Sequence, residues 1–317
     1  MVAKIFIDGE AGTTGLQIRE RLAGRRDLEV LSIASDKRKD QDERKRLLNA
    51  ADIAILCLPD DAAKESVSLI ENGTTRVIDA STAFRVDPDW AYGFAEMDKG
   101  QSAKIANARF VANPGCWPQG LIANMRPLIE AGLIPADYPL TYNGISGYTG
   151  GGKQMISEYE AAGEAASQFM PYALTFQHKH VPEMTAYTKT KAAPLFVPTV
   201  GDFAQGMTTF VPLQLGQLAR VPTGRELHAA IADHFAAITD SFVEVAPFDA
   251  ALGKTLDLDP QAHNDTNTMT LHVFANDARA QAVLVAVYDN LGKGASGAAV
   301  QNLNLMLGVS ARESLAA

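Results

Sequence analysis

One cysteine stands in a segment whose residue types suit nucleophilic chemistry. Cys116 lies in Asn113-Pro114-Gly115-Cys116-Trp117-Pro118-Gln119-Gly120. Asn-Pro-Gly is typical of a tight turn, and the apolar spacing from Leu121 to Ile129 predicts an amphipathic helix after it. Pro118 suits the first turn of that helix, where its missing N–H costs nothing. The thiol is therefore predicted at a helix N-terminus, where unpaired N–H groups and the helix dipole favour a thiolate. A buried, inert cysteine is the alternative.

Two histidines are candidates for the proton transfer that a cysteine nucleophile needs near neutral pH. His178 and His180 stand in His178-Lys179-His180-Val181-Pro182-Glu183. Pro182 biases the residue before it away from helix, so the segment is predicted to be extended, and residues two apart in an extended chain share a face. Both rings are expected to face one cleft, and which of them meets the sulfur stays open. The remaining histidines lie in ordinary helix, loop or strand patterns and are interpreted as structural: His228, His234, His263 and His272.

A glycine-rich turn near the N-terminus predicts a dinucleotide site. Gly9, Gly12 and Gly15 follow the first predicted strand and open the first predicted helix, with Thr13 and Thr14 among them. Glycines there permit a tight turn and let a pyrophosphate approach backbone N–H groups at a helix N-terminus. The spacing is Gly-x-x-Gly-x-x-Gly rather than the commoner Gly-x-Gly-x-x-Gly. Its strand–turn–helix context favours dinucleotide binding over a plain loop.

The end of the second predicted strand indicates which dinucleotide binds. It reads Ser35-Asp36-Lys37-Arg38-Lys39. An acidic residue here is typical of NAD, whose ribose 2′-hydroxyl it binds, whereas basic residues suit the 2′-phosphate of NADP. The basic residues stand out in an acidic chain, so NADP is the expected cofactor, with Ser35 and Arg38 assigned to it. Asp36 keeps NAD open, and a solvated charged loop is the structural alternative.

The charge balance and composition exclude several kinds of partner. The chain has 317 residues, 28 basic and 37 acidic, and a formal net charge of −9, which argues against nucleic acid or an anionic membrane as the main partner. No apolar run approaches the ~20 residues that cross a bilayer, and Lys4 interrupts the N-terminal apolar stretch, so a cytoplasmic protein is expected. Two cysteines make no disulfide framework, Cys57 is interpreted as a core residue, and no metal site is expected.

Two domains are expected from the chain length and from a change of rhythm at Cys116. Before it, short β-type runs alternate with helical patterns, which predicts an α/β fold with a Rossmann-type parallel sheet and helices on both faces. Residues 1–115, together with a returning C-terminal helix in 295–317, form the predicted NADP-binding domain. Its predicted elements are strands 4–8, 28–33, 53–58 and 76–79 and helices 14–22, 40–50 and 62–71.

Residues 116–294 form the predicted catalytic and oligomerisation domain, an α+β unit with a mixed, largely antiparallel sheet. A glycine-rich loop is expected to begin at Ser146 and Gly147, where its glycines suit close approach of a substrate. The other predicted elements are strands 207–213, 243–245, 269–274 and 282–288 and helices at about 156–168 and 224–236.

Several motifs together carry a family resemblance. They are Gly9–Gly15, Asp79–Arg85, Asn113–Cys116, Ser146–Gly147, His178–Glu183, Asp289–Ala295 and Gln301–Asn304. A Rossmann-type start followed by Pro-Gly-Cys at the opening of a second domain is the layout of dehydrogenases that reduce acyl phosphates through a thioester. The chain closely resembles the N-acetyl-gamma-glutamyl-phosphate reductase family in its shorter form, over nearly the whole length. Trp117-Pro118-Gln119 departs from the Tyr/Phe-x-Thr that many members carry after the cysteine.

The resemblance implies NADPH-dependent reduction of N-acetyl-L-glutamyl 5-phosphate to N-acetyl-L-glutamate 5-semialdehyde with release of phosphate, a step of arginine biosynthesis. Cys116 would form the thioester, which turns one difficult step into two easier ones. Leu58 and Pro59, after the third predicted strand, are expected along the dinucleotide, and the resemblance places Asn290 at its nicotinamide end. A homo-oligomer, dimer or tetramer, is expected.

A substrate with a phosphate and an α-carboxylate needs cations or backbone N–H groups to bind it. Arg85 is the candidate cation, because it follows Ser81 and Thr82 beyond a predicted strand end, where α/β sheets bind ligands. A surface salt bridge is the structural alternative for Arg85. The other residues assigned to the substrate are Ser81, Asn113, Ser146, Gly147 and Glu183.

Three other functions stay open. Aspartate-semialdehyde dehydrogenase has the same chemistry on a shorter substrate without the acetyl group, and the segment His178–Glu183 argues against it. A cysteine hydrolase that uses Cys116 and a histidine leaves Gly9–Gly15 unexplained. A non-catalytic, dinucleotide-sensing protein would keep its biological activity without the thiol of Cys116.

Overall fold

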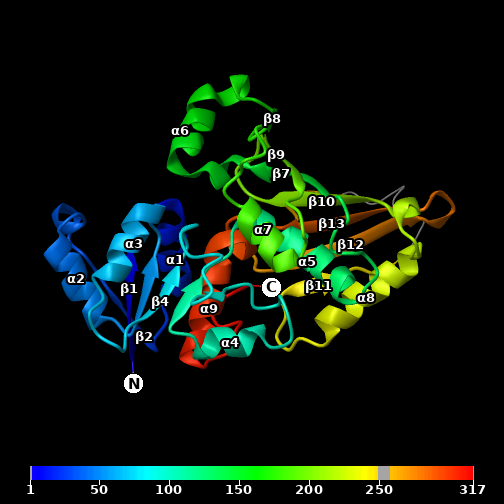
Figure 1. Ribbon diagram of the computed structural model, residues 1–317. Coiled ribbons are helices and arrows are strands. Elements are labelled where there is room, and N and C mark those ends of the chain that lie inside the picture. The colour runs from blue at the N-terminus through cyan, green and yellow to red at the C-terminus, as the bar shows by residue number, and fades with distance from the viewer. Residues whose placement is uncertain (1, 249–257, 317) are drawn as a thin grey trace. The chain divides into compact units, whose positions relative to one another are not determined.

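The computed structural model describes residues 2–248 and 258–316, which form two compact units (Figure 1). Unit 1 consists of residues 2–95, 100–115 and 295–316. Unit 2 consists of residues 96–99 and of the described part of 116–294. The outer ends of the predicted domains, residues 1 and 317, lie outside the described residues. Within the described part of the chain, no helix is long and apolar enough to cross a membrane.

Unit 1 is built on a six-stranded parallel sheet with the strand order β2-β1-β3-β4-β6-β5. Every residue of β3 is buried, because strands of a parallel sheet are covered on both faces. This sheet confirms the predicted Rossmann-type fold. The strands are β1 (Ala3–Asp8), β2 (Leu28–Leu31), β3 (Ile53–Leu56), β4 (Arg76–Asp79), β5 (Ala91–Tyr92) and β6 (Phe110–Ala112).

Helices close both faces of this sheet with separate apolar cores. Ile5 and Ile7 of β1 share one core with side chains of three helices, α1 (Thr13–Leu22), α4 (Gln101–Asn107) and α9 (Gly297–Leu307). Phe6 lies between them in sequence and points to the other core, with α2 (Gln41–Ala50) and α3 (Asp60–Ser68), as the period of two in a strand requires. The C-terminal helix thus returns to unit 1 as predicted, and a π-helical turn, Gly292–Ser296, precedes it.

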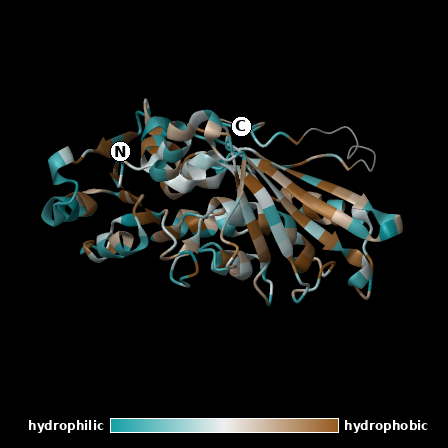
Figure 2. Ribbon diagram, turned by 90° about the horizontal axis from the view of Figure 1, so that it is seen from above, coloured by the Kyte–Doolittle hydropathy of each residue, from teal (hydrophilic) through white to brown (hydrophobic). Residues whose placement is uncertain are grey.

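Unit 2 contains a seven-stranded mixed sheet with the strand order β11-β12-β13-β10-β7-β9-β8. Two pairs, β11–β12 and β7–β9, are parallel and the other four are antiparallel, which confirms the predicted mixed, largely antiparallel sheet. Buried and part-exposed residues alternate along β12, and hydrophobic and hydrophilic bands alternate along the strands in Figure 2. The strands are β7 (Thr141–Gly147), β8 (Phe169–Pro171), β9 (Leu195–Gly201), β10 (Met207–Gln214), β11 (Val243–Val245), β12 (Met269–Asn276) and β13 (Gln281–Tyr288).

One face of this sheet is covered by α5 (Cys116–Glu130) and α8 (Gly224–Ala236). α5 packs against β10, β13, α8 and α7 (Val181–Thr188), so it lies at the centre of unit 2. α8 begins with a capping box, in which the Thr223 hydroxyl accepts the N–H of Glu226 and the Glu226 carboxylate accepts the N–H of Thr223. Its bounds agree with the predicted helix at 224–236.

Several elements differ from the prediction. Ser146 and Gly147 end β7 rather than beginning a loop, and the helix expected at 156–168 is α6 (Gly152–Ala162). The prediction missed β7, β8, β9 and α7 in unit 2, and β5, β6 and α4 in unit 1. Gly144 within β7 and Pro198 within β9 interrupt the strand-like runs. Gly144 is required there, because a Cβ would lie 2.5 Å from the Thr208 carbonyl oxygen of the neighbouring strand.

Candidate active site

Cys116 is the first residue of α5, which confirms the predicted helix N-terminus. β6 ends at Ala112, and Asn113-Pro114-Gly115 makes the turn before the helix. The cysteine is part-exposed rather than sealed in the core. Burial, followed by the nearby charges of Asp79 and Asp8, raises the pKa of the other thiol, Cys57, to about 12. Cys57 is therefore a poor nucleophile, and Cys116 is the candidate.

The turn that follows β13 packs tightly against Cys116. A Cβ built on Gly294 would lie 2.9 Å from Cys116 Cβ, so only glycine allows the backbone to pass so close. The Gln119 side-chain amide donates to the Lys293 carbonyl oxygen at 2.8 Å and ties the same turn to the start of α5. A π-helical turn such as Gly292–Ser296 is often found at a functional site.

His178 and His180 stand in a turn, not in the extended segment that the sequence predicted. His180 has helical backbone angles (φ −86°, ψ −11°) and is the N-cap of α7, with Pro182 in the first turn. The proline therefore begins a helix, where its ring fits, instead of extending the chain before it. The two rings nevertheless meet, with their centroids 4.7 Å apart, and the His180 N–H donates to His178 Nδ1 at 3.2 Å. Burial, followed by the charge of Lys179, lowers the pKa of His178 to about 4.

Aromatic side chains join the first turn of α5 to this histidine pair. Trp117 packs edge-on against Phe196 at 5.3 Å and donates its ring N–H to the Tyr172 hydroxyl at 3.1 Å. Phe196 and Tyr172 in turn contact the His178 ring at 5.2 and 5.7 Å. Burial and then the charge of Cys116 raise the pKa of Tyr172. The structure thus brings the cysteine and the histidines into one neighbourhood of unit 2, through a tryptophan that sequence reasoning treated only as a departure from the family pattern.

A cavity of about 460 Å³ in unit 1 lies beside the glycine-rich turn. Three of the predicted cofactor residues line it, Gly9, Arg38 and Leu58. Gly12 is the N-cap of α1, and Thr13, Thr14 and Gly15 form its first turn, so their N–H groups lie where a phosphate binds. Pro59 is the N-cap of α3, and Ser35 begins a short 3₁₀ turn. The complete lining is Asp8, Gly9, Glu10, Ala11, Ile33, Arg38, Lys39, Arg44, Leu58, Ala62 and Glu65.

Two glycines of the turn are sterically required. Gly9 has φ +90°, and a Cβ on it would lie 2.3 Å from the Cys57 carbonyl oxygen. A Cβ on Gly15 would lie 2.6 Å from the Gly9 carbonyl oxygen. The turn therefore presses against Cys57, directly after β3, and against the start of its own helix, as the close packing of a dinucleotide-binding turn requires.

Charges in this cavity are arranged in pairs. Glu10 forms ion pairs with Arg38 at 3.2 Å and with Arg19 at 2.6 Å. Arg44, which sequence reasoning missed, is buried and pairs with Asp8 at 3.1 Å and with Glu65 at 2.8 Å. Arg38 is 43% exposed, so its guanidinium remains accessible at the rim. The basic run of α2 was the available signal for Arg44, but its burial comes only from the fold.

The predicted substrate residues of unit 1 gather beyond the ends of β4 and β6. Arg85 is buried, which excludes the surface salt bridge, and its guanidinium donates to the carbonyl oxygens of Asn113 and Ala80, at 3.0 Å each. Ser81 donates to Asp79 at 2.6 Å. Burial raises the pKa of Asp79 to about 6, against the opposing hydrogen bonds of Ser81. Three of the predicted residues are thus close together in the chain's own hydrogen-bond network.

The predicted residues of unit 2 are also buried. Ser146 and Gly147 are the last two residues of β7, and Glu183 lies in the first turn of α7. The Asn290 side chain accepts the N–H of Gly206 at 2.7 Å and donates to the Thr149 hydroxyl at 3.1 Å. These bonds tie the turn after β13 to the segment after β7 and to the residue before β10.

Comparison with known proteins gives the family. Models described as semialdehyde dehydrogenase, NAD binding domain, and semialdehyde dehydrogenase, dimerisation domain, match residues 4–105 and 116–290. An N-acetyl-gamma-glutamyl-phosphate reductase of Chelativorans sp. (strain BNC1) is 68% identical over 97% of this chain and 99% of its own. One of Mesorhizobium japonicum is 67% identical over 98% and 100%. The chain belongs to the N-acetyl-gamma-glutamyl-phosphate reductase family.

Solved structures place this reductase-family fold among the semialdehyde dehydrogenases. Aspartate semialdehyde dehydrogenase II from Vibrio cholerae superimposes with a TM-score of 0.68 over 97% of this chain and 99% of its own, at 16% identity. The enzyme from Francisella tularensis superimposes with a TM-score of 0.69 over 96% and 100%, also at 16% identity. At such identity the likeness establishes the shared fold alone. Among the described residues of this reductase-family chain, no cluster of His, Cys, Asp or Glu side chains could hold a metal ion.

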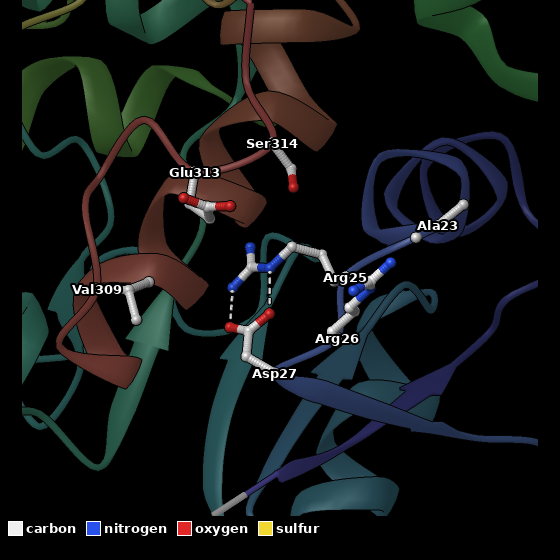
Figure 3. Close-up of a pocket in the computed structure, with 8 residues that line it drawn as sticks. Ala23, Arg25, Arg26, Asp27, Val309, Glu313 and Ser314 are labelled. Carbon is white, nitrogen blue, oxygen red and sulfur yellow. Dashed lines mark hydrogen bonds and ion pairs between the residues drawn. The ribbon is translucent and has the colours of Figure 1, made fainter.

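A second cavity of unit 1, about 590 Å³, lies away from the dinucleotide turn (Figure 3). Arg25 makes two bonds to the Asp27 carboxylate, at 2.7 and 2.6 Å, and a third to Asn304 at 2.9 Å. Asp27 directly precedes β2, so this cavity opens at the amino ends of the strands. Ligands of α/β sheets bind at the carboxyl ends of the strands. In this family member the glycine-rich turn that begins at Gly9 lies at that end, directly after β1.

Proposed function

We propose that this protein catalyses the NADPH-dependent reduction of N-acetyl-L-glutamyl 5-phosphate to N-acetyl-L-glutamate 5-semialdehyde, with release of phosphate, in arginine biosynthesis. Relatives that carry the name of this reductase support it, because they are 67–68% identical over nearly the whole chain. The observation in this chain that carries the proposal is the part-exposed Cys116 at the first residue of α5, beside the aromatic cluster that leads to His178.

The proposed chemistry proceeds through a thioester on Cys116. The thiolate attacks the carbonyl carbon of the acyl phosphate, and the bond to the phosphate oxygen breaks, so that phosphate leaves with both electrons of that bond. A bound nicotinamide cofactor supplies the hydride that reduces the thioester. The thiohemiacetal that results loses its hydroxyl proton while the C–S bond breaks, which releases the aldehyde and restores the thiolate.

In this proposal the two histidines have different roles: His178 donates a hydrogen bond and His180 exchanges a proton. The low pKa of His178 keeps its ring neutral near pH 7. A neutral ring that accepts a hydrogen bond at Nδ1, as His178 does from the His180 N–H, carries its proton on Nε2. His178 is thereby suited to donate to the carbonyl oxygen on which charge develops, and His180 is proposed to exchange the proton.

NADP is the proposed cofactor rather than NAD. Arg38 and Lys39 line the cavity beside Gly9, whereas Asp36 does not. Glu10 holds the Arg38 guanidinium at 3.2 Å in a position where it can receive a 2′-phosphate. In this proposal unit 1 is the NADP-binding domain, with Leu58 and Pro59 along the dinucleotide.

The remaining roles follow from the same reaction. Arg85, Ser81 and Asn113 of unit 1 are proposed to bind the substrate, and Asn290 of unit 2 to meet the nicotinamide end of the cofactor. The further residues proposed to contact substrate in unit 2 are Ser146, Gly147 and Glu183. The match of residues 116–290 to a dimerisation-domain model supports a homo-oligomer, dimer or tetramer, assembled through unit 2. A cytoplasmic location is proposed with it.

The reverse reaction tests the substrate and the nucleophile together. The purified protein is incubated with NADP⁺, phosphate and either N-acetylglutamate semialdehyde or aspartate semialdehyde, and formation of NADPH is followed. Faster turnover of aspartate semialdehyde would overturn the substrate assignment. Cys116→Ala is expected to abolish turnover while calorimetry shows unchanged NADPH binding, and Cys57→Ala, the matched control, is expected to keep both. Turnover by Cys116→Ala would refute the thioester, and hydrolysis without cofactor would favour a cysteine hydrolase.

A further inference from the structure

Two buried tyrosine hydroxyls lie against the first turn of α5. Tyr288, the last residue of β13, donates to the Cys116 carbonyl oxygen at 2.7 Å and accepts the Gly120 N–H at 3.3 Å. Residues four apart are the ones whose backbone groups bond to each other in an α-helix. The hydroxyl therefore bridges the carbonyl of the candidate nucleophile and the N–H one turn later.

Tyr142 of β7 makes the same contact one residue further along. Its hydroxyl donates to the Trp117 carbonyl oxygen at 2.7 Å and accepts the N–H of Leu121. Tyr142 and Tyr288 are both 0% exposed. Burial raises the pKa of both hydroxyls, so both stay protonated and remain donors throughout the physiological range.

The helix is shaped to admit these hydroxyls. A Cβ on Gly120 would lie 2.6 Å from Thr209 Oγ1, 2.9 Å from the Tyr288 hydroxyl and 3.1 Å from the Tyr142 hydroxyl. Three adjacent strands of one sheet, β7, β10 and β13, supply these three side chains. The position of the first turn of α5 is thus set by the sheet beneath it.

We propose that Tyr288 and Tyr142 are positioning residues, which fix the Cys116 backbone to the sheet and favour its thiolate. The inference rests on the proposed function, in which Cys116 is the nucleophile. Tyr288 holds the carbonyl of the cysteine itself, so removing the hydroxyl frees the residue that carries the sulfur. Each O–H also turns its positive end toward the first turn, which adds to the potential of the unpaired N–H groups there.

Alkylation of the thiol across pH tests the proposal without any need for turnover. Rates of reaction with iodoacetamide are measured for the wild-type protein, Tyr288→Phe and Tyr142→Phe, all in the Cys57→Ala background, so that Cys116 is the one thiol. The pH midpoint of alkylation is expected to rise by about 0.5 or more in each variant. For reduction of the acyl phosphate, kcat is expected to fall about tenfold while KM stays within about twofold.

Tyr138→Phe is the matched control. The Tyr138 hydroxyl accepts the Gln214 N–H at 2.7 Å, and Gln214 ends β10 seven residues beyond Met207, which pairs with Tyr288. That spacing puts the control hydroxyl about 23 Å along the strand from Tyr288. Tyr138→Phe is expected to keep the wild-type alkylation profile.

An unchanged midpoint in both Tyr288→Phe and Tyr142→Phe would overturn the proposal and leave the tyrosines as packing residues, whatever the change in melting temperature. Tyr142→Phe keeps the test decisive if Tyr288→Phe does not fold. A shifted midpoint in a protein that fails to reduce the acyl phosphate would support the tyrosine role and count against the proposed function, so the two failures are distinguishable.

Discussion

Replacing Lys293 by methionine is expected to make the stability of this protein fall as the pH rises, and replacing Glu96 by glutamine to make it rise. In the native protein Lys293 Nζ lies 2.6 Å from Glu96 Oε2, and both side chains are 1% exposed. The Lys293 carbonyl receives the Gln119 amide from the start of α5, and Glu96 Oε1 accepts the Phe242 N–H at 3.1 Å. Removing one partner of a buried pair leaves a charge without compensation, which typically costs about 3–5 kcal/mol.

The lone charge can escape this cost by changing its protonation state. A glutamate in water has a pKa of about 4.3, so neutralising the carboxylate left by Lys293→Met costs about 3.7 kcal/mol at pH 7 and about 1 kcal/mol at pH 5. The folded variant then binds one proton more than the unfolded chain, so its free energy of unfolding falls by about 1.4 kcal/mol per unit of rising pH.

The opposite sign holds for Glu96→Gln. A lysine in water has a pKa of about 10.4, so the ammonium left behind must give up its proton at a cost of about 4.6 kcal/mol at pH 7. The folded variant binds one proton fewer than the unfolded chain, and its free energy of unfolding rises with pH by the same amount per unit.

Urea unfolding at pH 5, 7 and 8.5 measures both slopes against the wild-type protein. The two single variants are expected to exchange order between the ends of this range. The double variant Lys293→Met/Glu96→Gln is expected to follow the pH dependence of the wild-type protein and to recover much of the loss, because no charge stays buried. If the free energy of unfolding of each single variant depended on pH as that of the wild-type protein does, the reasoning would be refuted, since the remaining charge would then be solvated in the folded state.

Two further substitutions test the cofactor site and the packing of α5 on the sheet. Arg38→Ala is expected to weaken NADPH binding about tenfold, the value of one charge-assisted contact, and to leave NADH binding nearly unchanged, as measured by calorimetry; Lys37→Ala, outside the cavity lining, is the control, and equal weakening for both cofactors would defeat the 2′-phosphate assignment. Gly120→Ala is expected to cost about 1–3 kcal/mol of unfolding free energy, because its Cβ meets Thr209 Oγ1 at 2.6 Å. Gly73→Ala is the control, because a Cβ at that position would have no atom within 4 Å. Equal melting temperatures for the two glycine variants would disprove the close packing of Gly120 against Thr209.

Local features of the chain were enough to predict the parts whose causes are local. The start of α5 at Cys116 follows from a turn-forming triplet and a proline that suits a first helical turn. Gly9 has a positive φ directly after a strand, a backbone conformation that favours glycine, so the residue type alone indicates the turn. Strand β12 was recognised for the same reason, since its buried and part-exposed residues alternate, whereas β13 is an apolar run buried on both faces.

Local reasoning failed where two local rules competed. Pro182 restricts the residue before it, which suggested an extended segment, but a proline also suits the first turn of a helix. The structure follows the second rule, with α7 beginning at Val181. The histidine rings meet all the same, because the turn folds His178 back onto the N-cap residue His180.

The amino-acid sequence by itself therefore predicted where Cys116 stands at the start of a helix, the glycine turn after the first strand, and a change of fold type near residue 116 in this family member. Only the tertiary structure decided what surrounds them. The Tyr288 hydroxyl meets the Cys116 carbonyl across 172 residues of chain, and Lys293 meets Glu96 across 197. Such contacts depend on which strands become neighbours in the sheet and which segments pack on it. No local pattern of residues records that choice, because it is made by burial of the whole core.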